Sequence, residues 1–118
     1  MELVASLGND KENWGQISAL MNRLECTKIV LVKDKKTEDF PEDERVIVIS
    51  VDTSVPLVSL VEELKEKLKV EVSGDFEVAV SLASGTGKEH MALIAALLGV
   101  PVGVKLVVFT KEGVKFIS

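Results

Sequence analysis

The chain has 118 residues, enough for one domain with a buried core and too few for two domains of ordinary size. Hydrophobic residues make up 47% of the sequence and charged residues 28%, a composition typical of a soluble globular α/β protein. The net charge of −5 argues against broad binding to nucleic acid, which draws on a basic surface. We therefore expect a single domain over residues 1–118, with no direct DNA binding by this chain.

Membrane and metal signals are weak. No apolar run approaches the roughly 18 residues that a membrane-spanning helix needs, so no membrane association is expected. The first residues, MELVASLG, lack the basic leader of a signal peptide, which favours a cytoplasmic location. The single cysteine, Cys26, excludes an internal disulfide and leaves zinc without its usual ligands. We interpret Cys26 as a packing residue and expect no metal and no cofactor.

Strands and helices alternate along the chain. Apolar runs and helical spacing predict, in order, a strand at 2–7, a helix at 11–24, strands at 28–32 and 45–51, a helix at 56–69, a strand at 76–82, a helix at 88–98, and a hairpin of strands at 104–109 and 114–117. Asn9 or Asp10 could cap the first helix, and Pro56 could open the second. The charged segment 34–44 is interpreted as a solvated loop, and 73–75 as a break before the next strand.

Unbroken apolar strands that alternate with helices indicate a parallel sheet with both faces covered. The simplest arrangement is a Rossmann-like three-layer α/β sandwich with strand order 3-2-1-4, followed by the C-terminal hairpin. The link between strands two and three, at about eleven residues, is short for a parallel crossover, so a reversed third strand is the alternative. Strands one and four would meet at the topological switch point, where ligands bind in open α/β sheets. The turns at 7–10 and 83–88 would then line one crevice.

The second of these turns, from Ser84 to Lys88, joins an apolar strand to an apolar helix. Such a junction directs backbone N–H groups and a helix N-terminus at one point, which suits an anion. A P-loop does not fit, because Leu82 stands where a glycine is needed and Glu89 where the magnesium-binding hydroxyl belongs. A dinucleotide-binding G-x-G-x-x-G fails at His90. In the alternative interpretation, the glycines only make a tight turn and Lys88 is solvated.

The helix from Lys88 to Leu98 is apolar on almost every side. A helix without a polar face is fully buried, which in so small a domain favours a partner subunit; the alternative is a helix covered within one chain. A two-fold dimer formed by this helix would bring both copies of Lys88 near the axis. His90, the single histidine, has no evident partner for acid–base chemistry and is interpreted as a surface or packing residue. Asp10 and Asp52 could reach the site, or serve only as cap and turn residues.

Three segments resemble the CRISPR-associated Rossmann-fold (CARF) domains. LVASLGND is similar to that family's opening strand and ligand loop, and VKLVVFTKEGVKFI to its closing hairpin. The more specific segment, VAVSLASGTGKEHMALIAALL, resembles the strand, Gly/Thr-rich turn, lysine and small-residue helix of the family. Here the order Gly-Thr-Gly replaces the usual Gly-Gly-Thr, and two residues rather than one separate Lys88 from Met91.

The resemblance implies a homodimer that binds a cyclic tetra- or hexa-adenylate across its two-fold axis, in the type III CRISPR signalling of antiviral defence. It places residues of both turns around the ligand. Those of the first turn would border the ring: Gly8, Asn9 and Asp10. Those of the second would hold phosphates and ribose hydroxyls: Ser84, Gly85, Thr86, Gly87 and Lys88.

Three roles remain possible, and the first two belong to different functional classes. As a binding module, the chain is a sensor that acts through an effector or partner. As an enzyme, it is a stand-alone ring nuclease that linearises the messenger without metal, with Lys88 as the catalytic residue and Thr86 or Asn9 orienting the attacking hydroxyl. The third role is that of a Rossmann-like domain for an ordinary mononucleotide.

Overall fold

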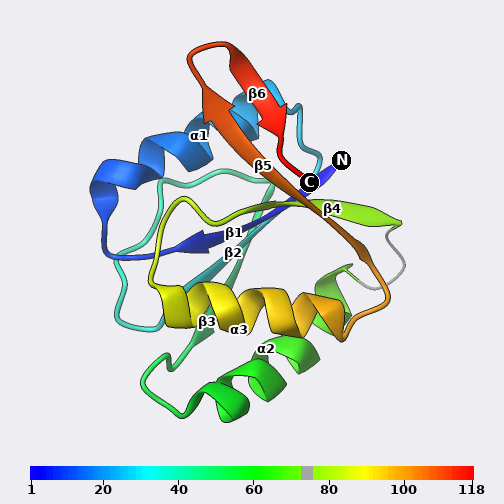
Figure 1. Ribbon diagram of the computed structural model, residues 1–118. Coiled ribbons are helices and arrows are strands. Elements are labelled where there is room, and N and C mark those ends of the chain that lie inside the picture. The colour runs from blue at the N-terminus through cyan, green and yellow to red at the C-terminus, as the bar shows by residue number, and fades with distance from the viewer. Residues whose placement is uncertain (73–75) are drawn as a thin grey trace.

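The computed structural model describes residues 1–72 and 76–118. The segment 73–75, which we expected to separate the second helix from the next strand, therefore lies outside the described residues. Strands and helices alternate as expected (Figure 1). In chain order the elements are β1 (Glu2–Leu7), the short 3-10 helix η1 (Lys11–Asn13), α1 (Trp14–Arg23), β2 (Ile29–Asp34), β3 (Val46–Val51), α2 (Leu57–Val72), β4 (Glu77–Ser81), α3 (Gly87–Leu98), β5 (Gly103–Thr110) and β6 (Gly113–Phe116).

The six strands of the described residues form one sheet in the order β3-β2-β1-β4-β5-β6. All neighbouring pairs are parallel except β5 and β6, which form the expected C-terminal hairpin. Its tight turn includes Gly113, whose φ of +106° suits a glycine. The Rossmann-like strand order predicted from the apolar runs is therefore confirmed.

The alternative of a reversed third strand is wrong, because β3 pairs with β2 in parallel from Ile29↔Val46 to Asp34↔Val51. The link between the two strands crosses the sheet without a helix. Phe40 in this link packs against Trp14 of α1, with ring centroids 5.6 Å apart. The crossover needs no helix, because side chains such as Phe40, packed on Trp14, attach it to the layer of α1.

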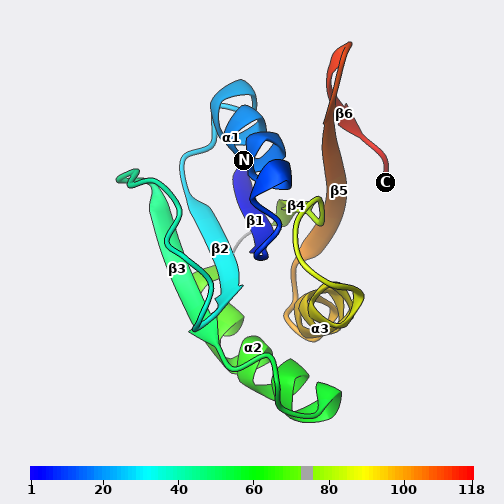
Figure 2. The ribbon, with the colours of Figure 1, turned by 90° about the vertical axis from the view of Figure 1, so that its left-hand side faces the viewer.

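Helices cover both faces of the sheet, which gives the predicted three layers (Figure 2). α1 lies on one face over a core that includes Leu3, Ile17 and the buried Cys26. α2 and α3 lie side by side on the other face, over a core that includes Leu64 and Leu93. No helix in the described part of the chain is long and apolar enough to cross a membrane.

Candidate functional site

The candidate site lies where β1 and β4 end. The two strands are parallel neighbours, with Val4 opposite Val80 and Ala5 opposite Ser81, so they finish at the same edge of the sheet. The loops that follow, 8–10 and 82–86, therefore meet at the switch point of the strand order. The juxtaposition that the sequence predicted is present.

The two loops touch each other. A Cβ atom placed on Gly8 would lie 2.5 Å from the Cα of Gly85, so only glycine fits at this contact. Gly85 has φ +102°, and a Cβ there would lie 2.5 Å from the hydroxyl of Ser6. In the single chain the two loops are in contact at this point, because the two glycines allow the backbones to approach closely, and the crevice shared by the turns stays a prediction.

Asp10 joins the two loops. Its Oδ1 accepts hydrogen bonds from the Ser84 hydroxyl at 2.6 Å and from the backbone N–H of Gly85 at 3.0 Å. Its other oxygen accepts from the Asn13 amide at 2.8 Å. The Ser84 hydroxyl also accepts a hydrogen bond from the backbone N–H of Gly8 at 2.8 Å. Asp10 and the fully buried Ser84 are therefore committed to holding the loops together.

The ionisation of Asp10 reflects this bonding. Burial opposes the charged form, but hydrogen bonds from Ser84, Asn13 and Gly85 outweigh it and lower the pKa of Asp10 to about 2. Although Asp10 stands at the N-cap position of η1, neither its side chain nor that of Asn13, the N-cap residue of α1, makes a capping hydrogen bond. The prediction that Asn9 or Asp10 caps the first helix is wrong, because the carboxylate of Asp10 is directed to the second loop.

The N-terminus of α3 carries a capping box. The Thr86 hydroxyl accepts a hydrogen bond from the Glu89 N–H at 3.3 Å, and Glu89 Oε1 accepts one from the Thr86 N–H at 2.8 Å. The Thr-x-x-Glu spacing, which is visible in the sequence, was a signal for this role of Glu89. The N–H groups of Gly87 and Lys88 belong to the first helical turn, so no intrahelical acceptor exists for them. Both residues are exposed, and these two N–H groups are open to an anion.

Lys88 reaches away from its own turn. Its Nζ donates a hydrogen bond to the backbone carbonyl of Val55 at 2.6 Å, in the loop that precedes α2. The side chain is exposed, and one hydrogen bond to a carbonyl leaves two of its three N–H donors for a ligand. Asn9, in the first loop, is also exposed. The outward-facing candidates are thus Asn9, Thr86, Gly87 and Lys88.

The remaining polar candidates have structural partners. His90 Nε2 lies 2.7 Å from the carbonyl oxygen of Ser84, which places the imidazole beneath the turn. Asp52 accepts a hydrogen bond from the N–H of Ser54 at 3.0 Å, which fits a turn residue. No cluster of three or more His, Cys, Asp or Glu side chains suited to a metal ion occurs within residues 1–72 and 76–118.

One face of α3 is left uncovered within the single chain. Ala92, Leu93 and Leu97 are buried against the sheet and α2, whereas Met91 is 61% exposed and Leu98 is 73% exposed. Half-buried Ile94 and Ala95 lie between these two at helical spacing, so they extend the same apolar stripe. The alternative of a helix covered entirely by its own chain therefore fails.

The fold and this edge define a Rossmann-like α/β domain with two interlocked loops at its switch point. Neither a scan against protein-family models nor a search of curated proteins finds a match to the chain.

Proposed function

We propose that this chain is a CARF-type domain that binds a cyclic oligoadenylate at a homodimer interface. The observation that carries the proposal is the pairing of the loops at 8–10 and 82–86, next to an open helix N-terminus and the exposed Lys88. The resemblance of the same segments to the family gives the ligand class. A cyclic oligoadenylate carries one negative charge per nucleotide, so it requires this kind of anion-binding edge.

The contacts divide the eight candidate residues into two groups. Gly8, Asp10, Ser84 and Gly85 build the edge, because their polar groups bond to one another and their backbones touch. Asn9, Thr86, Gly87 and Lys88 are exposed and would contact the ligand. Thr86 accepts a hydrogen bond from Glu89, so its own O–H remains able to donate to a phosphate or ribose oxygen.

The uncovered stripe of α3 supports the dimer. Pairing α3 with its two-fold copy would bury Met91 and Leu98, and it would bring two helix N-termini and two Lys88 side chains toward the axis. Two copies of a weak anion site on one axis match a ring of repeating phosphates. The helix from Lys88 to Leu98 thus serves as both interface and site.

The test is calorimetric titration of the purified chain with cyclic tetra- and hexa-adenylate. Wild type is expected to bind at least one of them, and Lys88→Ala to bind about tenfold or more weakly, since a charge-assisted contact is worth about 1.5–3 kcal/mol. Lys111→Ala is the matched control, because Lys111 is an exposed lysine in the distant hairpin turn. No binding of either ring by wild type contradicts the proposal.

A ring nuclease is the second candidate, favoured by the free donor capacity of Thr86 and Lys88. A ribose 2′-hydroxyl held in line would attack its neighbouring phosphorus. The P–O5′ bond breaks, the 2′-hydroxyl gives up its proton to water, the departing 5′ oxygen takes one from water, and the products are a 2′,3′-cyclic phosphate and a 5′-hydroxyl. Lys88 would stabilise the charge that develops on the phosphoryl oxygens, and Thr86 or Asn9 would orient the attacking hydroxyl.

Chromatography of the same mixtures separates these roles. Linear products that require Lys88 support the nuclease, and binding without products supports a sensor that acts through an effector or partner. Binding of AMP or ATP in preference to both rings would instead support a domain for an ordinary mononucleotide.

A further inference from the structure

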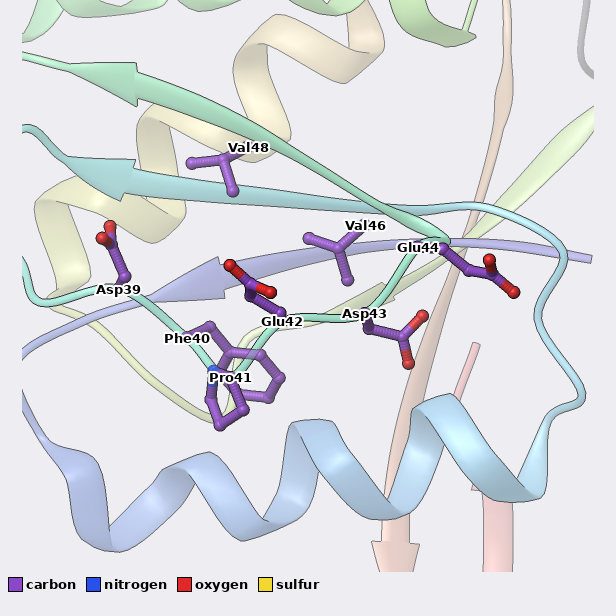
Figure 3. A pocket seen from close by; sticks show the side chains of 8 residues that line it. All are labelled: Asp39, Phe40, Pro41, Glu42, Asp43, Glu44, Val46 and Val48. Carbon is purple, nitrogen blue, oxygen red and sulfur yellow. The ribbon is translucent and has the colours of Figure 1, made fainter.

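A groove of about 710 Å³ lies beside β3 (Figure 3), and none of its lining residues belongs to the candidate site. One wall is the crossover segment 39–44, and the other is the first half of β3. Its apolar lining consists of Phe40, Pro41, Val46 and Val48, and Val48 is 49% exposed. The groove therefore combines an open apolar surface with one strand of the sheet.

β3 is an edge strand with an unpaired side. The carbonyl of Arg45 accepts a hydrogen bond from the N–H of Ile29 in β2 at 3.0 Å, and that of Val51 accepts one from Lys35, directly after β2, at 2.8 Å. Because parallel ladders alternate, the backbone groups of Val46, Val48 and Ser50 point away from β2. Val46 N–H and Ser50 C=O are bonded to Asp43 and to the Lys67 ammonium.

No strand lies beyond β3 in the described sheet. This leaves the carbonyls of Val46 and Val48 and the N–H groups of Val48 and Ser50 facing outward. These four groups form two donor–acceptor pairs, as one added strand requires.

The groove is rimmed by carboxylates. Asp43 is held by Arg45, and Asp39 lies 3.2 Å from the ammonium of Lys33. Glu42 and Glu44 are exposed, and neither forms an ion pair with a described lysine or arginine, although the charge of Glu44 acts on the neighbouring Arg45. No lysine or arginine lines the groove, so its rim has excess negative charge.

We propose that this groove and the free edge of β3 bind an extended segment of a partner protein that carries lysine or arginine at alternate positions. The segment adds a strand to β3 through the outward backbone groups of Val48 and its neighbours. Its alternate side chains point to the same face as Val46 and Val48, where cationic ends meet Glu42 and Glu44 and their methylene stems cover the valines. Charge complementarity selects this occupant, because an acidic segment would be repelled.

The competing explanation is that Glu42 and Glu44 only protect an exposed edge strand from pairing with other chains. The two explanations differ in one measurable respect. A protective rim repels any added strand or is indifferent to it, whereas a docking rim gives saturable binding that depends on the sign of the peptide's charge.

The test uses decapeptides with lysine at alternate positions and valine or threonine between, alongside counterparts with glutamate in place of lysine. Binding to the intact chain is followed by fluorescence anisotropy and by amide chemical shifts. The lysine peptides are expected to bind saturably, with shift changes centred on Val46–Ser50, and the glutamate peptides are expected not to bind.

Substitutions in the chain test whether the peptides bind at the groove and at the edge of β3. The double change Glu42→Gln and Glu44→Gln is expected to weaken binding about tenfold. The matched control, Glu62→Gln with Glu66→Gln, removes two exposed glutamates from α2 and is expected to change binding less than about twofold. Val48→Pro, which removes an outward N–H from the edge, is expected to abolish binding.

Three results would overturn the proposal. These are no saturable binding of the lysine peptides, equal weakening by the α2 control pair, or shift changes centred away from β3. Should Val48→Pro fail to fold, the glutamate variants and the shift map still decide the outcome.

Discussion

Asp10 shows how one side chain builds the site without facing the ligand. It lies 74 positions from Ser84 in the sequence, yet its carboxylate accepts both the Ser84 hydroxyl and the Gly85 N–H. Because these donors stabilise the ionised form, Asp10 contributes to stability only while it is charged. Its lowered pKa, about 2, makes this contribution measurable.

Asp10→Asn is expected to lower the free energy of unfolding by about 1 kcal/mol near neutral pH, a value that allows for solvent screening of a partly exposed group. The folded-state pKa lies below the usual 3.8, so the contribution is present above about pH 4 and is lost as the pH falls through about 2. Urea unfolding of both proteins from pH 7 to pH 2 measures it.

The difference between the two proteins should close toward pH 2. Asp43, whose pKa is also lowered to about 2 by Arg45, titrates in both and cancels in the comparison. A difference that stays constant over the whole range would mean that the charge of Asp10 is unimportant.

The glycines of the turn make a second residue-scale prediction. Gly85→Ala is expected to cost about 1–3 kcal/mol, because it combines a positive φ with contacts below 3 Å to Ser6 and Glu89. Gly87→Ala is the matched control: a Cβ there meets nothing within 4 Å, and alanine favours the helix. Thermal unfolding checks both, and equal effects would argue against the positive φ and the close packing of Gly85.

At the scale of elements, α3 combines three roles. Its N-terminus offers the open N–H groups, its buried face packs on the sheet and α2, and its other face carries an exposed apolar stripe. A stripe that includes Met91 and Leu98 next to the candidate site is the reason to expect a dimer through this helix.

Leu98→Lys is expected to convert the dimer to a monomer, because a charge would be buried at the two-fold interface. Val70→Lys is the matched control: Val70 is 78% exposed and lies in the last turn of α2, as Leu98 does in α3. Sedimentation velocity at micromolar concentration distinguishes the two states. If wild type is a monomer with and without cyclic adenylate, the dimer proposal fails.

At the scale of the whole molecule, the strand order was predictable because it follows from local patterns in the sequence. Apolar runs, helical spacing and the hairpin turn mark each element, and the parallel pattern then determines which strands end together. Contacts between distant residues were not predictable in this way. Phe40 on Trp14 explains how a short crossover suffices, and no local pattern indicates it.

The candidate site was likewise predictable only where a local sequence pattern indicates it. The turn from Ser84 to Lys88 was recognisable from its glycines, its lysine and the helix that follows. The role of Asp10 was not, since an aspartate before a helix has the same local signal as a cap. The apolar sequence of α3 favoured a partner subunit, but which face stays uncovered was not predictable, because an apolar helix does not reveal which of its sides its own chain covers.

Native mass spectrometry of the chain with cyclic tetra-adenylate and cyclic hexa-adenylate tests most directly whether two chains share one ring. We expect a complex of two chains with one ring for at least one of the two ligands, and its loss in Lys88→Ala. A complex of one chain with one ring, or no complex with either ligand, would contradict a shared site at a two-fold axis.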